Sequence, residues 1–267
     1  MTLNTINNIK EKLNGEIPIT RKELLVLVNS WGRNNSFYVK DCINNVLYID
    51  RCKIESCCDL SKLDTSQITN MDKIFYYSNF NGDISQWNTS NVTSMNFMFC
   101  EAKEFNQTLN NWDTSKVTSM ISMFKYTEKF NQDISSWNVS NVEDMIHMFA
   151  FNSKFNSPLN NWNVSNVTSM CSMFLETKSF NQNISSWNLD KVEKCDFMLD
   201  KAKAFENKYN SGEPLPNKTK EIKDWFNLNR ERMNIIDIKE KHGKEIDNFF
   251  SNFSKINNIN SLNIKYK

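Results

Sequence analysis

The stretch FNQDISSWNVSNVEDMIHMF, residues 130–149, contains the pattern that decides the fold. Its tryptophan belongs to a series that recurs every 25 residues, namely Trp87, Trp112, Trp137, Trp162 and Trp187. Self-similarity at a fixed period of about 20–50 residues is the signature of a repeat architecture. The chain is therefore expected to build one structural unit several times in succession.

Apolar residues around each tryptophan keep the same interval. The columns are Phe80, Phe105, Phe130, Phe155, Phe180 and Phe205; Val92, Val117, Val142, Val167 and Val192; Met95, Met120, Met145, Met170 and Cys195; Met98, Met123, Met148, Met173 and Met198; and Phe99, Phe124, Phe149, Phe174 and Leu199. A degenerate repeat precedes them, in which Leu63 replaces the tryptophan. The sequence thus predicts one degenerate and five full repeats.

The residue three positions before each tryptophan alternates between isoleucine and leucine, as in Ile84 and Leu109. Duplication of a paired unit and a packing device with unlike neighbours both explain the alternation. Because Ile84 and Trp87 are three residues apart, one continuous strand cannot point both side chains inward, and a bend is expected between them.

The 25-residue interval lies within the roughly 20–29 residues of leucine-rich repeats and is too short for propeller blades or helical hairpins. Residues 136–139 alternate polar and apolar, which indicates a short strand at the tryptophan, with tryptophans stacked at about 4.8 Å. Met95, Met98 and Phe99 share one face of a helical turn, and Thr93 is suited to cap it. We therefore expect an α/β repeat solenoid, a leucine-rich-repeat-like right-handed coil with one short parallel strand and one short helical turn per repeat.

Such a stack needs closed ends, because exposed apolar ends aggregate. Residues 20–23 (TRKE) form a capping box that predicts a helix ending at Gly32, and strand-like runs at 37–39 and 46–49 follow.

Apolar residues at helical spacing after Pro216 predict helices at the other end, which either fold back on the last repeat or dock on a partner or membrane surface. We expect helical caps at both ends: an N-terminal cap over 1–55, the solenoid over 56–205 and a C-terminal cap over 206–267.

The charge balance excludes some function classes. The chain of 267 residues has 32 basic and 31 acidic residues, a formal net charge of +1. Nucleic-acid binders carry a basic excess, so no nucleic-acid partner is expected. The N-terminus is polar and no stretch approaches the roughly 20 apolar residues of a membrane span, so neither a secretory signal nor a transmembrane segment is expected.

The seven cysteines form an odd set, which indicates reduced thiols. Cys52, Cys57 and Cys58 cluster, but no pair of CxxC motifs accompanies them and the chain has only two histidines. Buried thiols explain the cluster better than a metal site does, and we expect no metal and no cofactor.

Signals of catalysis are weak. His147 is the only histidine in the repeats and shares its column with Phe and Ser. No Ser or Cys nucleophile is marked out beside it, and the scarcity of glycine in the repeats argues against a phosphate loop. We therefore expect no enzymatic activity and no catalytic residue.

An asparagine follows the first phenylalanine of each repeat, at Asn81, Asn106, Asn131, Asn156 and Asn181. The column suits a ligand site or a structural ladder, in which each amide hydrogen-bonds the backbone of the next repeat. A regular stack favours the ladder.

Two polar columns flank the tryptophans and are expected to point outward from the predicted sheet. They are Gln86, Asn111, Ser136, Asn161 and Ser186 before the tryptophan, and Asn88, Asp113, Asn138, Asn163 and Asn188 after it. Repeat proteins use such faces for partners, so these ten residues are the predicted binding surface. A solvated face without a ligand is the alternative, since the columns contain few aromatic or arginine residues.

The repeat resembles that of BspA-like leucine-rich-repeat surface proteins, which is also found in many mycoplasma lipoproteins. The likeness rests on the W-N-V-S-N-V-T-x-M-x-x-M-F spacing and covers residues 60–205. The stretches PITRKELLVLVNSW (18–31) and LDTSQITNM (63–71) also resemble the lead-in of some members. The resemblance implies adhesion or protein binding, often at a bacterial surface, and no cofactor.

The expected function is therefore non-enzymatic binding of another protein or of a host or matrix surface. The alternative is a structural protein that self-associates through its cap helices, and the oligomeric state stays open. The resemblance implies a cell-surface or secreted location, while the lack of an export signal or lipobox keeps the cytoplasm as an alternative.

Overall fold

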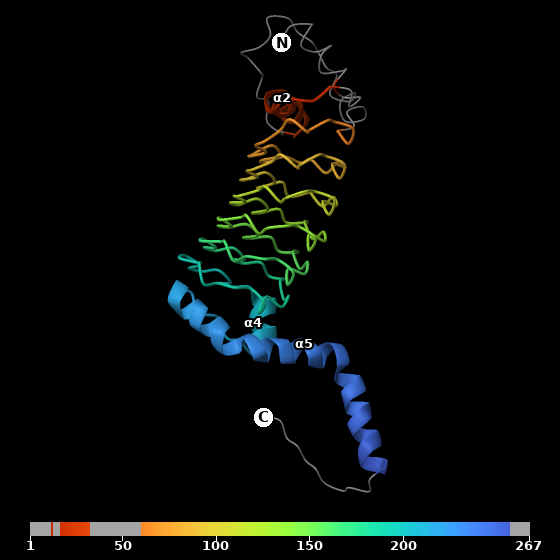
Figure 1. Ribbon diagram of the computed structural model, residues 1–267, viewed down its shortest axis with the longest axis vertical. Coiled ribbons are helices and arrows are strands. Elements are labelled where there is room, and N and C mark those ends of the chain that lie inside the picture. Colours follow the sequence, from red (N-terminus) through yellow and green to blue (C-terminus); the bar gives the residue numbers. More distant parts are fainter. Residues whose placement is uncertain (1–11, 13–16, 33–59, 257–267) are drawn as a thin grey trace, which may run out of the picture.

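A computed structural model of the chain describes residues 12, 17–32 and 60–256. These residues form a tall stack of coils, with helix α2 at one end and helices α4 and α5 at the other (Figure 1). Helix α2 spans Arg21–Gly32, α4 spans Lys203–Tyr209 and α5 spans Thr219–Ile256.

Neighbouring coils pair through single parallel bridges. The bridged residues are Asn70, Ser94, Ser119, Asp144, Ser169 and Lys194, one in each coil. No strand forms in the described ranges, and the residues predicted as helical turns form isolated turns instead. The prediction of a leucine-rich-repeat-like solenoid with a parallel strand and a helical turn in each repeat is therefore wrong.

The segment after each bridge shows why neither element forms. In one coil, the N–H groups of Met95, Phe97 and Phe99 donate to the following coil at 3.1, 2.8 and 2.9 Å. The N–H groups of Met98 and Cys100, which lie between them, donate three residues back within their own coil. Pairing between coils and tight turns within a coil thus alternate along the chain, so each pattern interrupts the other.

This alternation places two residues of each coil at positive φ. They form two columns: Lys73, Phe97, Ser122, His147, Ser172 and Phe197; and Tyr77, Glu101, Tyr126, Phe151, Glu176 and Lys201. A left-handed conformation costs an L-residue about 1–2 kcal/mol, which the hydrogen bonds between coils can offset. Regular helices and strands do not contain such residues.

Three aromatic columns fill the core of the stack. The tryptophan rings lie nearly parallel, with centroids 6.3–6.5 Å apart. This distance exceeds the expected spacing of about 4.8 Å because the rings stack with a sideways offset. The columns that include Phe80 and Phe75 stack similarly, and Phe99 contacts Phe105 with centroids 4.0 Å apart.

The alternating Ile/Leu column accepts hydrogen bonds from the tryptophans of the next coil. The indole N–H of Trp112 donates to the carbonyl of Ile84 at 3.1 Å, and that of Trp137 donates to Leu109 at 2.9 Å. The backbone N–H of Trp87 also donates to the Ile84 carbonyl, at 3.1 Å. This turn confirms the bend predicted between Ile84 and Trp87.

The asparagine column forms the structural ladder. The side-chain oxygen of Asn81 accepts the backbone N–H of Asn106 at 2.9 Å, and Asn106 accepts that of Asn131 at 3.0 Å. The same bond recurs to Asn156 and Asn181, at 2.7 and 2.9 Å. The structural interpretation of this column is confirmed.

Helix α2 closes the N-terminal end of the described coils. Its capping box is confirmed, because Thr20 N–H donates to Glu23 Oε2 at 2.9 Å and Glu23 N–H donates to Thr20 Oγ1 at 3.4 Å. Arg21 donates to the carbonyl of Asp72 at 2.7 Å and ties the helix to the first coil. The strand-like runs at 37–39 and 46–49, and the cysteines at 42, 52, 57 and 58, lie outside the described residues.

Helix α5 lies across the last coil, and its C-terminal part projects away from the stack (Figure 1). The last coil has no successor to pair with, and the C-terminal segment supplies partners for its backbone. Lys223 donates to the carbonyl of Val192 at 3.1 Å, and Arg230 donates to those of Trp187, at 2.7 Å, and Ser185. The predicted division into three domains stays a prediction.

Candidate functional site

The ten residues predicted to bind a partner are all exposed. In the column after the tryptophan, the side-chain oxygens of Asn88, Asp113, Asn138, Asn163 and Asn188 each accept the N–H two residues on, at 2.8–3.1 Å. These bonds close Asx turns, so this column has a structural role in every coil.

The column before the tryptophan is more varied. Ser136 and Ser186 donate to the carbonyls of Asn110 and Asn160 in the preceding coil, at 3.0 and 2.8 Å, and Gln86 bonds the neighbouring Ser85. Asn161 Oδ1 accepts from Asn160 Nδ2 at 3.1 Å, and Asn111 is exposed like the rest of the column. The structure thus places both columns beside the tryptophans but on turns, and the sheet face on which they were expected does not exist.

A second surface runs along the segments that pair between coils. We define the ladder edge as the two columns of positive-φ residues given above. Tyr77 is 54% exposed and Phe197 is 38% exposed, while Phe97, Tyr126 and Phe151 are partly exposed. The ladder edge therefore presents aromatic side chains, the residue type that dominates binding energy at protein interfaces.

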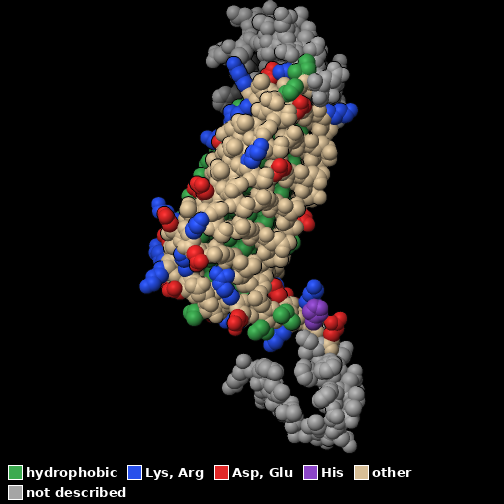
Figure 2. All heavy atoms as spheres, viewed as in Figure 1, with side chains coloured by type: hydrophobic (Ala, Val, Ile, Leu, Met, Phe, Trp, Pro, Cys, Tyr) green, Lys and Arg blue, Asp and Glu red, His purple; other side chains and the backbone are tan. Residues whose placement is uncertain are grey.

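Lysines lie over several of these rings. Lys73 lies 5.5 Å from the ring centroid of Phe97, and Lys218 lies 5.3 Å from that of Phe197. The rings of Tyr126 and Phe151 stack on each other at 4.4 Å. Figure 2 shows charged side chains of both signs scattered over the visible face.

The ladder edge was not predicted from the sequence, although a signal was present. Residues 125–129 and 150–154 are mostly polar and variable, as the residues of an exposed loop are. Tyr126 and Phe151 stand at equivalent positions of these stretches, one repeat apart. An aromatic residue that recurs in a polar loop indicates a surface contact or a packed edge.

The reactive groups among the described residues are poorly placed for catalysis. Burial, and to a lesser degree Lys125, lowers the pKa of His147, whose buried Nδ1 has no hydrogen-bond partner. Burial raises the pKa of Cys100 and of Cys195 to about 11, so both thiols are protonated at neutral pH. No group of His, Cys, Asp or Glu in the described part of the chain could hold a metal ion.

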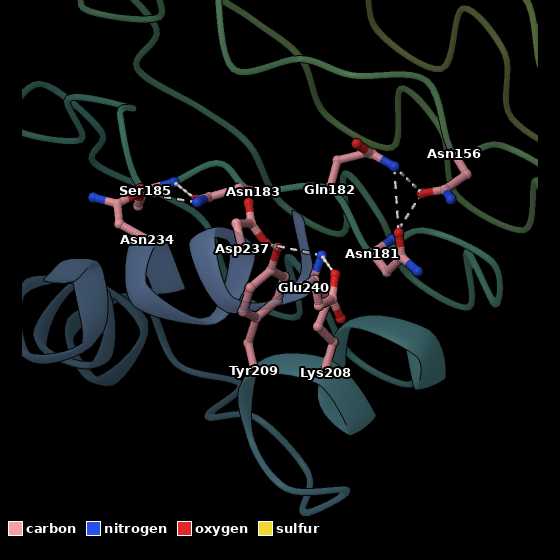
Figure 3. A network of polar contacts seen from close by, with 10 residues as sticks. All are labelled: Asn156, Asn181, Gln182, Asn183, Ser185, Lys208, Tyr209, Asn234, Asp237 and Glu240. Atoms are coloured by element: carbon pink, nitrogen blue, oxygen red, sulfur yellow. Dashed lines mark hydrogen bonds and ion pairs between the residues drawn. The ribbon is translucent and has the colours of Figure 1, made fainter. Parts of the chain in front are cut away.

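A polar network joins α4 and α5 beneath the coils (Figure 3). Tyr209 Oη donates to Asp237 Oδ1 at 2.7 Å, and Lys208 bridges Asp237 and Glu240 at 2.8 and 2.9 Å. Burial acts to raise the pKa of Asp237, but hydrogen bonds from Lys208 and Tyr209 outweigh it and the pKa is lowered. The carboxylate therefore stays charged at neutral pH and holds the two helices together.

None of the helices that the structure describes has an apolar stretch sufficient to cross a bilayer.

Three overlapping stretches match a family described as "Mycoplasma protein of unknown function, DUF285", over residues 47–151, 107–212 and 134–236. The chain belongs to the DUF285 family. The DUF285 matches together include every described coil and part of α5. These matches confirm that the chain is a mycoplasma-type repeat protein. They do not show that it is a BspA-like protein. No curated protein and no solved structure matches the chain.

Proposed function

We propose that this DUF285 protein is a non-enzymatic binding protein whose ladder edge contacts another protein. The observation that carries this function is the set of partly exposed aromatic side chains on five of the six coils, namely Tyr77, Phe97, Tyr126, Phe151 and Phe197. Aromatic side chains supply a large contact area at a low cost in conformational entropy.

The backbone beneath these side chains is held rigidly. Phe97 N–H donates to Ile121 O at 2.8 Å, and Tyr126 N–H donates to Ala150 O at 3.0 Å. A surface held in its binding conformation loses little entropy on association. The stack therefore favours recognition by a preformed edge.

The polar columns beside the tryptophans suit a rim around such a contact. Residues such as Asn138 and Asn163 are short, polar and exposed, and their side-chain oxygens are engaged in turns. Rim residues exclude water and contribute little energy individually. The ten predicted residues thus keep a proposed supporting role.

The likeness of the repeat to that of BspA-like surface proteins supports a host protein or matrix ligand as the partner, and a cell-surface or secreted location. Protease treatment of intact cells tests the location. We expect the protease to digest the protein before the cells are lysed. Full protection of the protein from the protease would instead indicate a cytoplasmic location.

The binding test compares two faces of the same coils. Purified wild type, the pair Tyr126→Ser with Phe151→Ser, and the pair Asn138→Arg with Asn163→Arg are immobilised and exposed to host-cell and matrix protein extracts. We expect the ladder-edge pair to lose the captured partner and the polar-face pair to retain most of it. Equal capture by the ladder-edge pair and wild type would remove the ladder edge as the binding surface.

A second candidate function is self-association through α5. Leu228, Ile235 and Ile238 are 83, 51 and 54% exposed on this helix. Exposed aliphatic residues on one helix favour helix pairing. Sedimentation of Ile235→Lys with Ile238→Lys tests it: a shift from oligomer to monomer supports self-association, and a wild-type monomer excludes it.

A further inference from the structure

An open pocket lies where α5 meets the last two coils, apart from the ladder edge. Its volume is about 380 Å³, within the roughly 300–1,000 Å³ of small-molecule sites. Asn160 comes from one coil, Ser185 and Ser186 come from the next, and Asn234 and Asp237 come from α5. Helix and coils together thus form a site that neither forms alone.

The described side chains that line the pocket are amides, hydroxyls and one carboxylate. No lysine, arginine, aliphatic or aromatic side chain is among them. An anion would find no opposite charge there, and an apolar ligand would leave the polar groups desolvated without hydrogen bonds. The lining suits a neutral ligand that both donates and accepts hydrogen bonds.

Asn234 is held in place by the last coil, across which α5 lies. Its side-chain oxygen accepts from Asn183 Nδ2 at 3.0 Å and from Ser185 Oγ at 2.7 Å. Figure 3 shows its amide nitrogen on the side away from both residues. The oxygen is thus occupied within the protein, and the two hydrogen bonds fix the orientation of the amide.

Asp237 supplies acceptors on the same helix, one turn further along. Tyr209 and Lys208 fix its Oδ1 at 2.7 and 2.8 Å, and Asn183 also contacts the carboxylate. An ionised carboxylate has more acceptor positions than these contacts occupy. The pocket lining therefore includes amide and hydroxyl donors together with a fixed carboxylate acceptor.

We propose that this pocket binds a neutral carbohydrate through the polar groups of Asn160, Ser186, Asn234 and Asp237. Each sugar hydroxyl donates one hydrogen bond and accepts up to two, so adjacent hydroxyls match the amide and carboxylate groups around the pocket. The site would let the DUF285 protein contact a glycan at its C-terminal end, whatever its ladder edge binds.

The test uses the full chain and four methyl glycosides: those of glucose, galactose, mannose and N-acetylglucosamine. Saturation-transfer NMR detects binding, and calorimetry measures the dissociation constant of those that bind. We expect at least one glycoside to bind, and glucuronate to bind no more tightly than methyl glucoside because no cation lines the pocket.

A matched pair of variants locates the site. Ser186 donates to the carbonyl of Asn160 at 2.8 Å, and Ser136 makes the same contact with Asn110 at 3.0 Å, two coils away from the pocket. Asn160→Arg should fill the pocket and weaken glycoside binding by about tenfold or more, a change of roughly 1.4 kcal/mol. Asn110→Arg makes the same change on the equivalent turn two coils earlier, at a residue that does not line the pocket. This variant should bind the glycosides as tightly as wild type does.

Three outcomes overturn the proposal. They are no binding of any of the four glycosides, equal binding by Asn160→Arg and wild type, and equal weakening by both arginine variants. The ladder-edge pair Tyr126→Ser with Phe151→Ser should keep glycoside binding, so failure of the protein-binding function and failure of the carbohydrate site are distinguishable.

Discussion

The indole N–H of Trp137 donates to the backbone carbonyl of Leu109, which lies 28 residues earlier, at 2.9 Å. Both residues are buried, with Trp137 only 3% exposed. The same contact recurs for each tryptophan of the stack. A side chain that packs in the core thus also bonds one coil to the preceding one.

Removal of this indole hydrogen bond should destabilise the stack even when an aromatic ring still fills the core. In Trp137→Phe the ring stays aromatic, but the Leu109 carbonyl loses the indole donor and keeps only the backbone N–H of Trp112, at 3.1 Å. We expect a loss of about 0.5–1.5 kcal/mol for the hydrogen bond, with a further cost for the smaller ring. Urea unfolding measures the change, with Asn111→Ala, at an exposed position beside the neighbouring tryptophan, as control. A loss below about 0.5 kcal/mol would show that the bond is dispensable.

The asparagine ladder predicts a difference between two substitutions at one site. Asn131 Oδ1 accepts the backbone N–H of Asn156 at 2.7 Å. Asn131→Ala leaves that N–H without a partner and should cost about 1 kcal/mol, while Asn131→Asp keeps an acceptor and should cost less. Thermal unfolding of the two variants compares them directly. An equal loss of stability in both variants would mean that the side-chain acceptor of Asn131 does not stabilise the stack.

The stacked repeat was predictable because burial needs the same residue type at the same place in every coil. Trp137, Phe130 and Met145 each recur at a 25-residue interval, and that register is independent of local conformation. The predicted strand and helical turn were wrong because both rest on local periodicity. Met95, Met98 and Phe99 do face the core, but turns joined by left-handed residues place them there.

The left-handed columns and the ladder edge could not be derived from residue preferences. Ser122, His147 and Phe151 are not glycines, yet hydrogen bonds between coils hold each at positive φ. The exposure of the ten polar residues followed from their position beside a buried tryptophan. The Asx turns of the five residues that follow the tryptophans could not be predicted, because they need the backbone path, which depends on contacts between coils.

The positive-φ positions predict an unusual benefit of glycine. Lys201 is exposed and has a φ of 57°. Its ion pair with Glu176 lies at the surface and contributes little. Lys201→Gly should therefore be at least as stable as wild type, and Lys201→Val should be less stable by about 1–2 kcal/mol. Chemical unfolding of both tests this, and the reverse order would contradict a left-handed backbone at this position.

The contact between α5 and the last coil predicts a role for one arginine. Arg230 donates to the carbonyls of Ser185 and Trp187. Arg230→Met keeps the aliphatic stem but removes these charged bonds and should cost about 2 kcal/mol. Arg232→Met is the control, because Arg232 is exposed and, among the described residues, bonds Ser211 Oγ alone, at 3.3 Å. If both variants unfold at the same urea concentration, Arg230 does not hold the helix in place.

The network around Asp237 predicts how stability changes with pH. Its pKa is lowered in the folded state by Lys208 and Tyr209, which outweigh the effect of burial. The charged carboxylate therefore stabilises the fold above the unfolded pKa of about 3.9, and this contribution is lost as pH falls through the folded pKa. Asp237→Asn should be less stable than wild type at pH 7, by no more than about 1 kcal/mol because solvent screens the pair.

Once the pH falls below the lowered pKa of Asp237 in the folded state, the two proteins should converge in stability, because the wild-type carboxyl is then largely protonated as well. Thermal unfolding at a series of pH values from neutral to acid gives the comparison. Asp224→Asn, an exposed change on the same helix, is the control and should follow wild type more closely at every pH. A gap between Asp237→Asn and wild type that stays constant into acid would mean that packing, and not the carboxylate charge, joins α4 to α5.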